Sequence, residues 1–123
     1  MIGIGIDVVE IKRIEDAYFK YENLFLNRIY TEKERLHAFK FKNFIEKLAG
    51  KFAAKEAVSK AFGTGIGKII YWKDIEVLHK PSGQPYVNLY NRAVELFKKF
   101  NGKEIFVSIT DIKDLAVAVV VIE

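Results

Sequence analysis

The segment from Gly50 to Gly63 constrains the fold most, because it reads as the second half of one long helix over residues 44–62. Alanine and lysine dominate it, and both are good helix formers. Asn43 is expected as the N-cap and Gly63 as the residue that ends the helix in the left-handed region. Residues four apart share a helix face, which makes a stripe of Ala49, Ala53, Ala57 and Ala61. A face with so little side chain predicts that a neighbouring sheet or helix packs closely against it.

The same helix carries one carboxylate, Glu56, between two further stripes. One is Leu48, Phe52, Glu56 and Lys60, and the other is Lys47, Lys51 and Lys55. Glu56 and Lys60 are spaced for an exposed ion pair, which is worth only ~0.3–0.5 kcal/mol. Glu56 is alternatively a functional carboxylate beside a tightly packed face. The spacing alone leaves both interpretations open.

Length and composition limit the classes of protein to consider. The 123 residues are expected to form one domain, residues 1–123. The absence of cysteine excludes disulfides, thiolate nucleophiles and cysteine zinc sites. No stretch reaches the ~18 apolar residues of a membrane span, and the N-terminus lacks a basic leader, so we expect a cytoplasmic protein without membrane attachment. The net charge of +4 favours an anionic partner: phosphates, nucleic acid or an acidic protein.

In the first third of the chain, β-branched residues alternating with glycine predict a strand over residues 2–9. Gly3 and Gly5 fall on one face, where another element can come close. Asp7 is expected at or just past the end of this strand, either as the N-cap of the next helix or as a functional carboxylate. Helices are predicted over residues 10–19 and 22–27, and a third to residue 39 opens with a Thr31–Glu34 capping box.

After the long helix, the Gly63–Gly67 run follows a helix rather than opening one, so it predicts a turn and not a phosphate-binding P-loop. Strands are predicted over 74–78, 85–87, 105–110 and 115–122, and a helix over 92–100. The last strand is apolar on both faces and must be covered on both sides, by helices or by another subunit. The pattern predicts an α+β fold, with a small antiparallel-type sheet packed against one long central helix and shorter helices. His37 is expected at the surface and His79 beside a turn.

The chemistry available to this chain is that of carboxylates and lysines. No nucleophile motif is present, and neither histidine has an evident partner. Mg²⁺ prefers oxygen ligands and shares its shell with substrate phosphates, whose remaining charge lysines and arginines neutralise. Asp7 and Glu56 are the best pair, since each lies beside small residues that leave room. These residues indicate Mg²⁺-dependent phosphate chemistry.

Several segments resemble the holo-[acyl-carrier-protein] synthases, the small bacterial 4′-phosphopantetheinyl transferases. The segments are 5–14 (GIDVVEIKRI), 48–57 (LAGKFAAKEA), 59–65 (SKAFGTG), 74–77 (DIEV), 82–85 (SGQP) and 107–110 (VSIT). They span nearly the whole chain in the family's order. The resemblance implies the 4′-phosphopantetheinyl transferase fold. It also implies Mg²⁺-dependent transfer of phosphopantetheine from coenzyme A to a serine of apo acyl carrier protein, with release of adenosine 3′,5′-bisphosphate.

The resemblance also implies roles for individual residues. Asp7 and Glu56 match the metal-binding acidic residues, and with the phosphate-side Lys60 they form the implied catalytic set. The coenzyme A region is matched by Lys47, Lys51, Phe52, Lys60, Gly63, Thr64, Gly65 and Thr110. The implied carrier-docking residues are Lys12, Arg13, Lys20 and Arg28, and the implied assembly is a homotrimer with shared active sites. Many members have Ser-His-Thr where this chain has Thr110-Asp111-Ile112, so we expect Asp111 to point away from phosphate or to meet a lysine.

Two other classes of function compete with this interpretation. A basic nucleic-acid-binding module predicts aromatic and basic side chains interleaved on an exposed sheet face, whereas the last strand here is wholly apolar. A metal-dependent nucleotide hydrolase would use the same carboxylates. Incubation with coenzyme A, Mg²⁺ and apo carrier protein separates these classes, and we expect no nucleic-acid partner.

Overall fold

The computed structural model describes residues 2–123 as one succession of helices and strands. They are β1 (Gly3–Glu10), α1 (Ile11–Tyr21), α2 (Asn23–Ile29), α3 (Glu32–Ala38), α4 (Phe44–Phe62), the 3₁₀ turn η1 (Trp72–Asp74), β2 (Ile75–His79), β3 (Pro85–Leu89), α5 (Arg92–Lys99), β4 (Ile105–Ile112) and β5 (Leu115–Ile122). The predicted bounds of the long helix and of the last strand are confirmed. No helix among these residues is long and apolar enough to cross a membrane.

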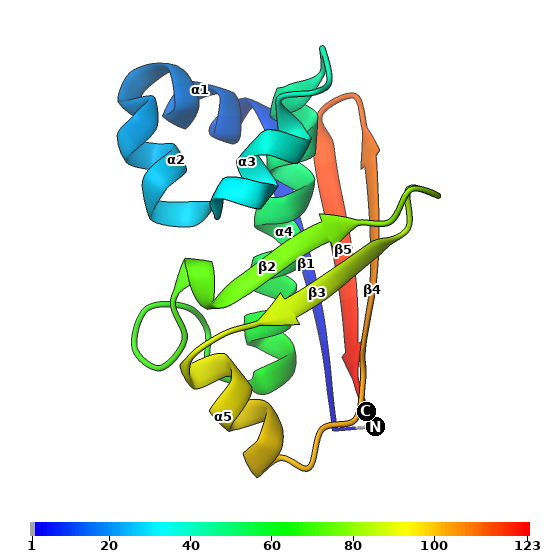
Figure 1. Cartoon of the computed structure of the whole chain (residues 1–123). Helices are drawn as coiled ribbons and strands as arrows, with labels where there is room; N and C mark the ends of the chain where they lie inside the picture. Colours follow the sequence, from blue (N-terminus) through cyan, green and yellow to red (C-terminus); the bar gives the residue numbers. More distant parts are fainter. Residues whose placement is uncertain (1) are drawn as a thin grey trace.

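The helix α4 forms the centre of the molecule and lies along one face of a three-stranded sheet (Figure 1). The strand order of this sheet is β1-β5-β4, and both pairs are antiparallel. The antiparallel hairpin β2–β3 crosses α4 as a second sheet, while α1 and α3 pack near its N-terminal half. The predicted α+β architecture, with an antiparallel sheet on one long helix, is confirmed.

The closest approach in the fold is between β1 and α4. A Cβ built on Gly3 would lie 1.9 Å from the backbone oxygen of Ala61, and one on Gly5 would lie 2.0 Å from that of Ala57. Only glycine can occupy these two positions, because any side chain would enter the backbone of the helix. The predicted alanine stripe therefore packs on the predicted glycine face, and it brings the strand that bears Asp7 against the helix that bears Glu56.

Two local predictions about strand ends are wrong. Asp7 lies inside β1, opposite Ala118 of β5, and Glu10 takes the N-cap position of α1. Strand β4 continues through Asp111 and Ile112, which pair with Ala116 and Leu115 of β5, so the connecting turn is shorter than predicted. In both cases the pairing with β5 extends the strand beyond the point where local propensity ends it.

The predictions for the ends of α3 and α4 are confirmed by the structure. Thr31 and Glu34 form the predicted capping box at the start of α3. Gly63 ends α4 with a φ of 81°, in the left-handed region where glycine carries no steric cost. Asn43 does occupy the N-cap position of α4, although its side chain makes no capping hydrogen bond.

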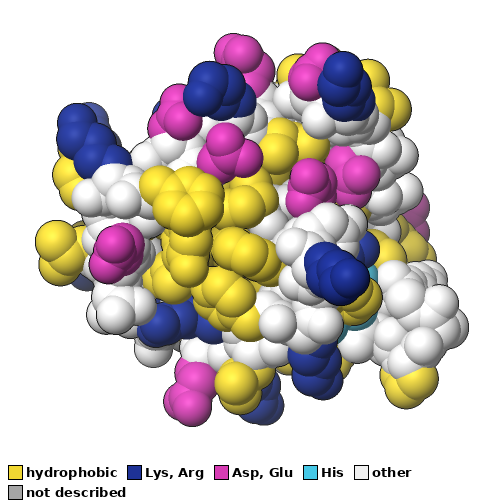
Figure 2. Space-filling view, turned by 90° about the horizontal axis from the view of Figure 1, so that it is seen from above, with side chains coloured by type: hydrophobic (Ala, Val, Ile, Leu, Met, Phe, Trp, Pro, Cys, Tyr) yellow, Lys and Arg dark blue, Asp and Glu magenta, His cyan; other side chains and the backbone are white. Residues whose placement is uncertain are grey.

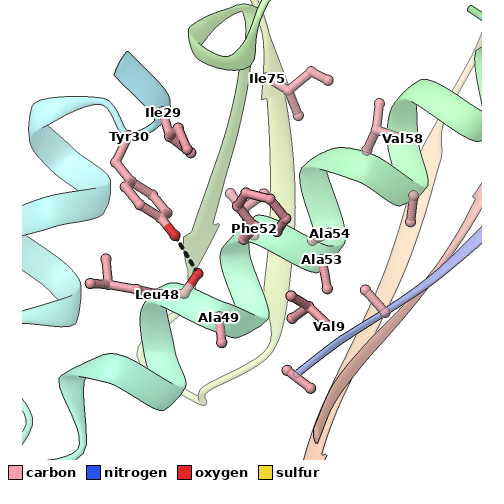
Figure 3. Close-up of a cluster of buried hydrophobic side chains, with 14 of the residues drawn as sticks. Val9, Ile29, Tyr30, Leu48, Ala49, Phe52, Ala53, Ala54, Val58 and Ile75 are labelled. Atoms are coloured by element: carbon pink, nitrogen blue, oxygen red, sulfur yellow. Dashed lines mark hydrogen bonds between the residues drawn. The ribbon is translucent and has the colours of Figure 1, made fainter. Parts of the chain in front are cut away.

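The core is centred on α4 and on the side chains that reach it from α2, β1 and the hairpin (Figure 3). Phe52 and Leu48 face the helical layer, where the buried hydroxyl of Tyr30 donates a 2.8 Å hydrogen bond to the Leu48 carbonyl. Ala49 and Ala53 face the strand side, near Val9. The helix is therefore buried on nearly all sides, which explains why its sequence lacks a clear polar stripe.

Two members of the lysine stripe are internal. Lys51 and Lys55 are fully buried under the β2–β3 hairpin. The Lys51 ammonium donates to the Val77 carbonyl at 2.8 Å, and the Lys55 ammonium donates to the Trp72 carbonyl at 2.9 Å. Backbone carbonyls of β2 and η1 thus satisfy the two buried ammonium groups.

One chain covers only one face of its main sheet. Ala116, Ala118, Val120 and Ile122 of β5 point toward α4 and are buried. On the opposite face of the sheet, Ile4, Ile6 and Val8 of β1 are 58%, 59% and 55% exposed. Within one chain, α4 covers one face of the last strand, and the other face stays partly exposed.

Candidate active site

The carboxylate of Asp7 and the ammonium of Lys60 meet where β1 crosses the C-terminal half of α4. Their ion pair spans 2.9 Å, and Lys60 also donates to the Ile6 carbonyl at 3.1 Å. The Asp7 side chain is 14% exposed and that of Lys60 is 50% exposed. Lys60 therefore pairs with Asp7 and not with Glu56, and the interpretation of Glu56 and Lys60 as a simple surface pair is wrong.

Glu56 lies one helical turn before Lys60 and is half-buried beside the Asp7 carboxylate. Burial raises the pKa of Glu56, and the neighbouring negative charge of Asp7 raises it further. The cations Lys60 and Arg13 oppose this shift. The two carboxylates thus converge although 49 positions separate them, as the packing of the alanine stripe on β1 requires.

A pocket of about 490 Å³ opens beside Glu56. Its wall opposite α4 comes from the segment after the helix, with Ile66, Gly67, Tyr71, Trp72 and Lys73, while Arg28 enters from α2. The pocket therefore presents one carboxylate together with an arginine and a lysine. Such a set of charges suits an anionic ligand whose charge a cation partly neutralises.

A second and larger pocket of about 700 Å³ adjoins the first, since Arg28 and Trp72 line both. Apolar side chains from α1 and α2 make most of its wall, with Phe52 at its base. The Arg13 guanidinium lies 5.8 Å from the centre of the Phe52 ring, within the range of a cation–π contact. Arg13 and Arg28 thus lie at the mouth of the site and join it to the outer surface of α1 and α2.

The other two predicted carrier-docking residues lie farther out on α1. Lys12 forms an exposed ion pair of 3.1 Å with Asp16, and the Lys20 ammonium lies 5.3 Å from the centre of the Tyr21 ring. Seen from above, this end of the molecule has hydrophobic side chains gathered in the middle of the face and charged side chains around them (Figure 2). Aromatic rings of α1 and α4 meet here, with Tyr18 and Phe44 5.4 Å apart.

A separate small pocket of about 160 Å³ contains two of the predicted coenzyme residues, Lys47 and Lys51. His79, Gly83 and Asp111 also contribute to it. Asp111 lines the same pocket as the two lysines, and a contact between Asp111 and a lysine stays a prediction. The exposed Thr110 is its neighbour on β4. Phosphate binding by Lys51 stays a prediction, but its ammonium is buried and already donates to a carbonyl.

The two histidines pack against each other beside this small pocket and are not solvated surface residues. The rings of His37 and His79 stack at 4.5 Å with planes 4° apart, and the Lys51 ammonium lies 3.4 Å from Nδ1 of His79. Burial, with the positive charge of Lys51, lowers the pKa of each histidine to about 4. Burial likewise lowers the pKa of Lys51 to about 8. The expectation that His37 is a solvated surface residue is wrong, because the hairpin brings His79 onto its ring.

The Gly63–Gly65 turn leads from α4 into the wall of the Glu56 pocket. Gly63 and Gly65 have φ values of 81° and 66°, and the Thr64 hydroxyl donates to the Gly65 carbonyl at 2.8 Å. The chain then passes directly into Ile66 and Gly67, which line the pocket. The turn thus directs the chain toward the site, without supplying side chains to it.

The residues that sequence reasoning missed come from η1 and its flanks. Tyr71, Trp72 and Lys73 line the pocket beside Glu56, and the Trp72 ring packs on Phe52 with ring centres 4.7 Å apart. The chain contains one tryptophan, which follows a glycine-rich run, and this was the available signal.

The oxygen donors of Asp7 and Glu56 fit a divalent cation. The negative charge of Asp7 raises the pKa of Glu56, and a nearby positive charge relieves this repulsion; Asp7 already accepts a bond from an ammonium. Mg²⁺ is commonly held by one or two carboxylates, with substrate phosphates completing its shell. Within residues 2–123, no group of three or more acidic or histidine side chains gathers as a metal site. The protein would therefore supply part of the shell and the substrate the rest.

The sequence and the fold of this chain match those of known proteins. Residues 3–120 match the model of the 4′-phosphopantetheinyl transferase superfamily. The chain is 42% identical to the holo-[acyl-carrier-protein] synthase of Chlamydia trachomatis serovar L2 over 123 residues, which is 100% of both chains. Its structure is similar to that of the holo-[acyl-carrier-protein] synthase from Neisseria meningitidis, with a TM-score of 0.91, 34% identity and coverage of 100% and 99%. The Helicobacter pylori synthase in complex with coenzyme A gives a TM-score of 0.86 and 37% identity, over 98% of this chain and 99% of that one.

Proposed function

Because this chain belongs to the 4′-phosphopantetheinyl transferase superfamily, we propose that it moves 4′-phosphopantetheine from coenzyme A to a serine of an apo acyl carrier protein. We further propose that the reaction depends on Mg²⁺ and releases adenosine 3′,5′-bisphosphate. The observation that carries the proposal is the convergence of Asp7, Glu56 and Lys60 beside a pocket that also contains Arg28 and Lys73.

In this proposal Asp7 and Glu56 hold the metal between them. When bound, Mg²⁺ supplies a Lewis acid and a template for the pyrophosphate. Lys60, half-exposed and one turn from Glu56, stabilises the charge that develops on the phosphoryl oxygens. Arg28 and Lys73 neutralise the remaining phosphate charge at the mouth of the pocket.

Glu56 is the better of the two carboxylates to accept the proton of the attacking serine. Glu56 lines the pocket in which the serine would approach the phosphate, and Asp7 does not. Asp7 is instead engaged by the ammonium of Lys60 at 2.9 Å. The serine oxygen would then form the new bond to the β-phosphorus, while the bond from that phosphorus to the bridging oxygen breaks and the nucleotide leaves.

The position of Lys47 supports an active site shared between subunits. Lys47 and Lys60 lie 13 residues apart on one helix, and therefore about 20 Å apart along its axis. The pyrophosphate and the 3′-phosphate of coenzyme A are attached to the same ribose, so a nucleotide whose pyrophosphate lies at Lys60 does not bring its 3′-phosphate to Lys47 of the same chain. We propose that Lys47, Lys51 and Thr110 of one subunit complete the nucleotide site that Asp7, Glu56 and Lys60 of another begin.

The exposed sheet face supplies the surface for that assembly, which we propose is a homotrimer. Ile4, Ile6 and Val8 on β1 and Phe106 on β4 are each about half exposed, and exposed apolar patches of this kind mark interfaces. A trimer number follows from the family resemblance alone. Light scattering tests it, and a stable, fully active monomer at micromolar concentration would contradict both the trimer and the shared site.

The same face argues against the nucleic-acid-binding alternative. That class of function needs basic and aromatic side chains interleaved on an open sheet face. The residues on this face are instead mainly aliphatic. A metal-dependent nucleotide hydrolase remains the relevant alternative, because it would use the same carboxylates.

The decisive experiment incubates the protein with coenzyme A, Mg²⁺ and an apo acyl carrier protein. We expect mass spectrometry to show one phosphopantetheinyl group added to the carrier, and chromatography to show adenosine 3′,5′-bisphosphate. Glu56→Gln should abolish the transfer, while Glu95→Gln on the exposed face of α5 should leave it intact. Hydrolysis of coenzyme A with an unchanged carrier would identify a nucleotide hydrolase, and the absence of any reaction would overturn the proposal.

A further inference from the structure

A fully buried ion pair connects α3 with α4 next to the active site. The ammonium of Lys55 lies 2.8 Å from a carboxylate oxygen of Glu34, and both side chains are 0% exposed. Burying two charges is costly, and well-packed apolar residues often replace such a pair without loss of stability. Stability alone therefore does not explain why this ion pair is present. The other hydrogen bonds of Lys55 and Glu34 indicate a second role.

The remaining hydrogen bonds of Lys55 reach the carbonyl of the first residue of η1 and that of the residue directly after η1. It donates to the Trp72 carbonyl at 2.9 Å and also to the carbonyl of Ile75. Glu34 in turn accepts a 2.7 Å bond from the backbone N–H of Val77 in β2. The ion pair thus attaches both ends of the η1 segment, and the first part of β2, to the central helix.

This η1 segment is the wall opposite Glu56. Tyr71, Trp72 and Lys73 line the Glu56 pocket, and Trp72 also lines the larger pocket beside it. Lys55 and Glu56 are consecutive on α4. One turn of α4 therefore carries both the candidate catalytic carboxylate, Glu56, and the ammonium of Lys55, which is hydrogen-bonded to η1.

We propose that Lys55 and Glu34 form a positioning pair, which sets the width of the coenzyme pocket by fixing η1 against α4. The proposal rests on the proposed function for the identity of the ligand, coenzyme A. Neither residue lines the pocket, so both act through Trp72 and its neighbours. An uncharged pair of similar volume, methionine with glutamine, would fill the same space, but the methionine could not bind the two carbonyls, and this difference makes the role testable.

The test compares single and double variants. Lys55→Met or Glu34→Gln alone leaves a buried group without its partner and should destabilise the fold. The double variant Lys55→Met/Glu34→Gln removes both charges and should recover part of that stability. Its KM for coenzyme A should nevertheless rise about tenfold, with the KM for the carrier protein within about twofold of wild type, because a loosened wall misplaces the ligand.

The single tryptophan gives a second, direct readout. Because Trp72 is the only tryptophan in the chain, its emission reports on η1 alone, and we expect a red shift in the double variant. Val120→Ala, in β5 behind α4, is the control for lost stability: it should lower the unfolding midpoint while leaving the Trp72 emission and the KM for coenzyme A unchanged. If the double variant does not fold, Lys55→Gln, which keeps a donor for Glu34 but is too short for both carbonyls, carries the same expectation.

The outcomes are separable from those of the proposed function. A double variant with wild-type emission and a wild-type KM for coenzyme A would show that the pair is only structural and would overturn the inference. If the wild-type protein neither binds nor uses coenzyme A, the proposed function fails. In that case the Trp72 emission of the variants still decides whether the pair positions the wall.

Discussion

Replacing Gly5 by alanine is the sharpest test of the packing that creates the site. The new Cβ would lie 2.0 Å from the Ala57 oxygen and 2.8 Å from the Ala61 nitrogen, whereas ordinary contacts begin near 3.4 Å. Both clashes are with backbone atoms of α4, so no rotamer change relieves them. Strand and helix must therefore separate by about 1.4 Å, which is the difference between the clash distance to Ala57 and an ordinary contact.

The expected cost in stability follows from that displacement. Overpacking a core ordinarily costs ~1–3 kcal/mol, and a clash between two backbones belongs at or above the upper end of that range. We therefore expect Gly5→Ala to lower the free energy of unfolding by about 3 kcal/mol or more, out of a total of ~5–15 kcal/mol for a domain. Urea unfolding followed by circular dichroism measures this change.

Activity should fall even where the variant remains folded. Asp7 is on the displaced strand, and Glu56 and Lys60 are on the helix, so the Asp7 carboxylate moves relative to both of them. A misplacement of about 1 Å commonly costs ~10²-fold in rate, which steady-state transfer assays at low urea would detect.

Gly50→Ala is the matched control for the loss of unfolding free energy expected in Gly5→Ala. Its Cβ would lie 3.0 Å from a single side-chain atom, the Cγ2 of Ile109, and near no backbone atom, and alanine is favoured in a helix by about 1 kcal/mol. We expect its stability to lie within about 1 kcal/mol of wild type. If Gly5→Ala unfolds at the wild-type urea concentration and transfers at the wild-type rate, β1 and α4 are not packed at this distance and the reasoning fails.

Four further results are expected. The raised pKa of Glu56 means that its ionisation opposes folding, so Glu56→Gln should raise the melting temperature of the metal-free protein at pH 7, and thermal melts should show the gain vanishing below about pH 4. The pKa values of His37 and His79 are lowered to about 4, so the neutral rings contribute fully to the free energy of unfolding above pH ~6.5, and this contribution is lost as pH falls toward 4. Allowing for partial exposure, the contribution is about 1–2 kcal/mol. His37→Gln should therefore flatten the pH dependence of the unfolding free energy between these two pH values. Lys60→Ala should cut turnover at least tenfold but change the unfolding free energy by less than about 1 kcal/mol, because its ion pair is half-exposed; wild-type turnover would return Lys60 to the role of a surface charge. Arg13→Ala should raise the KM for the carrier protein while leaving that for coenzyme A within about twofold, and an equal rise in both would show that Arg13 serves the coenzyme.

The sequence by itself determined the elements whose signals are local. The long helix, its left-handed glycine end and the capping box of α3 depend on residues a few positions apart, which is why their positions were predictable. The Gly3 and Gly5 face and the alanine stripe are also periodic patterns, and together they predicted the crossing that joins Asp7 to Glu56. The family motifs then supplied the roles of these residues, which spacing alone had left open.

Only the tertiary structure decided where charges lie when distant segments cover them. The spacing of Lys51 and Lys55 shows only that they share a helix face, whereas in the structure both are buried, and the carbonyls of Val77 and Trp72 replace water as their partners. The β2–β3 hairpin stacks His79 on His37, and the register with β5 carries β1 past Asp7. Trp72 joins the site for the same reason, since a ligand wall is made by contacts over long sequence separations. Local periodicity describes which residues share a face, but what covers that face depends on the rest of the chain.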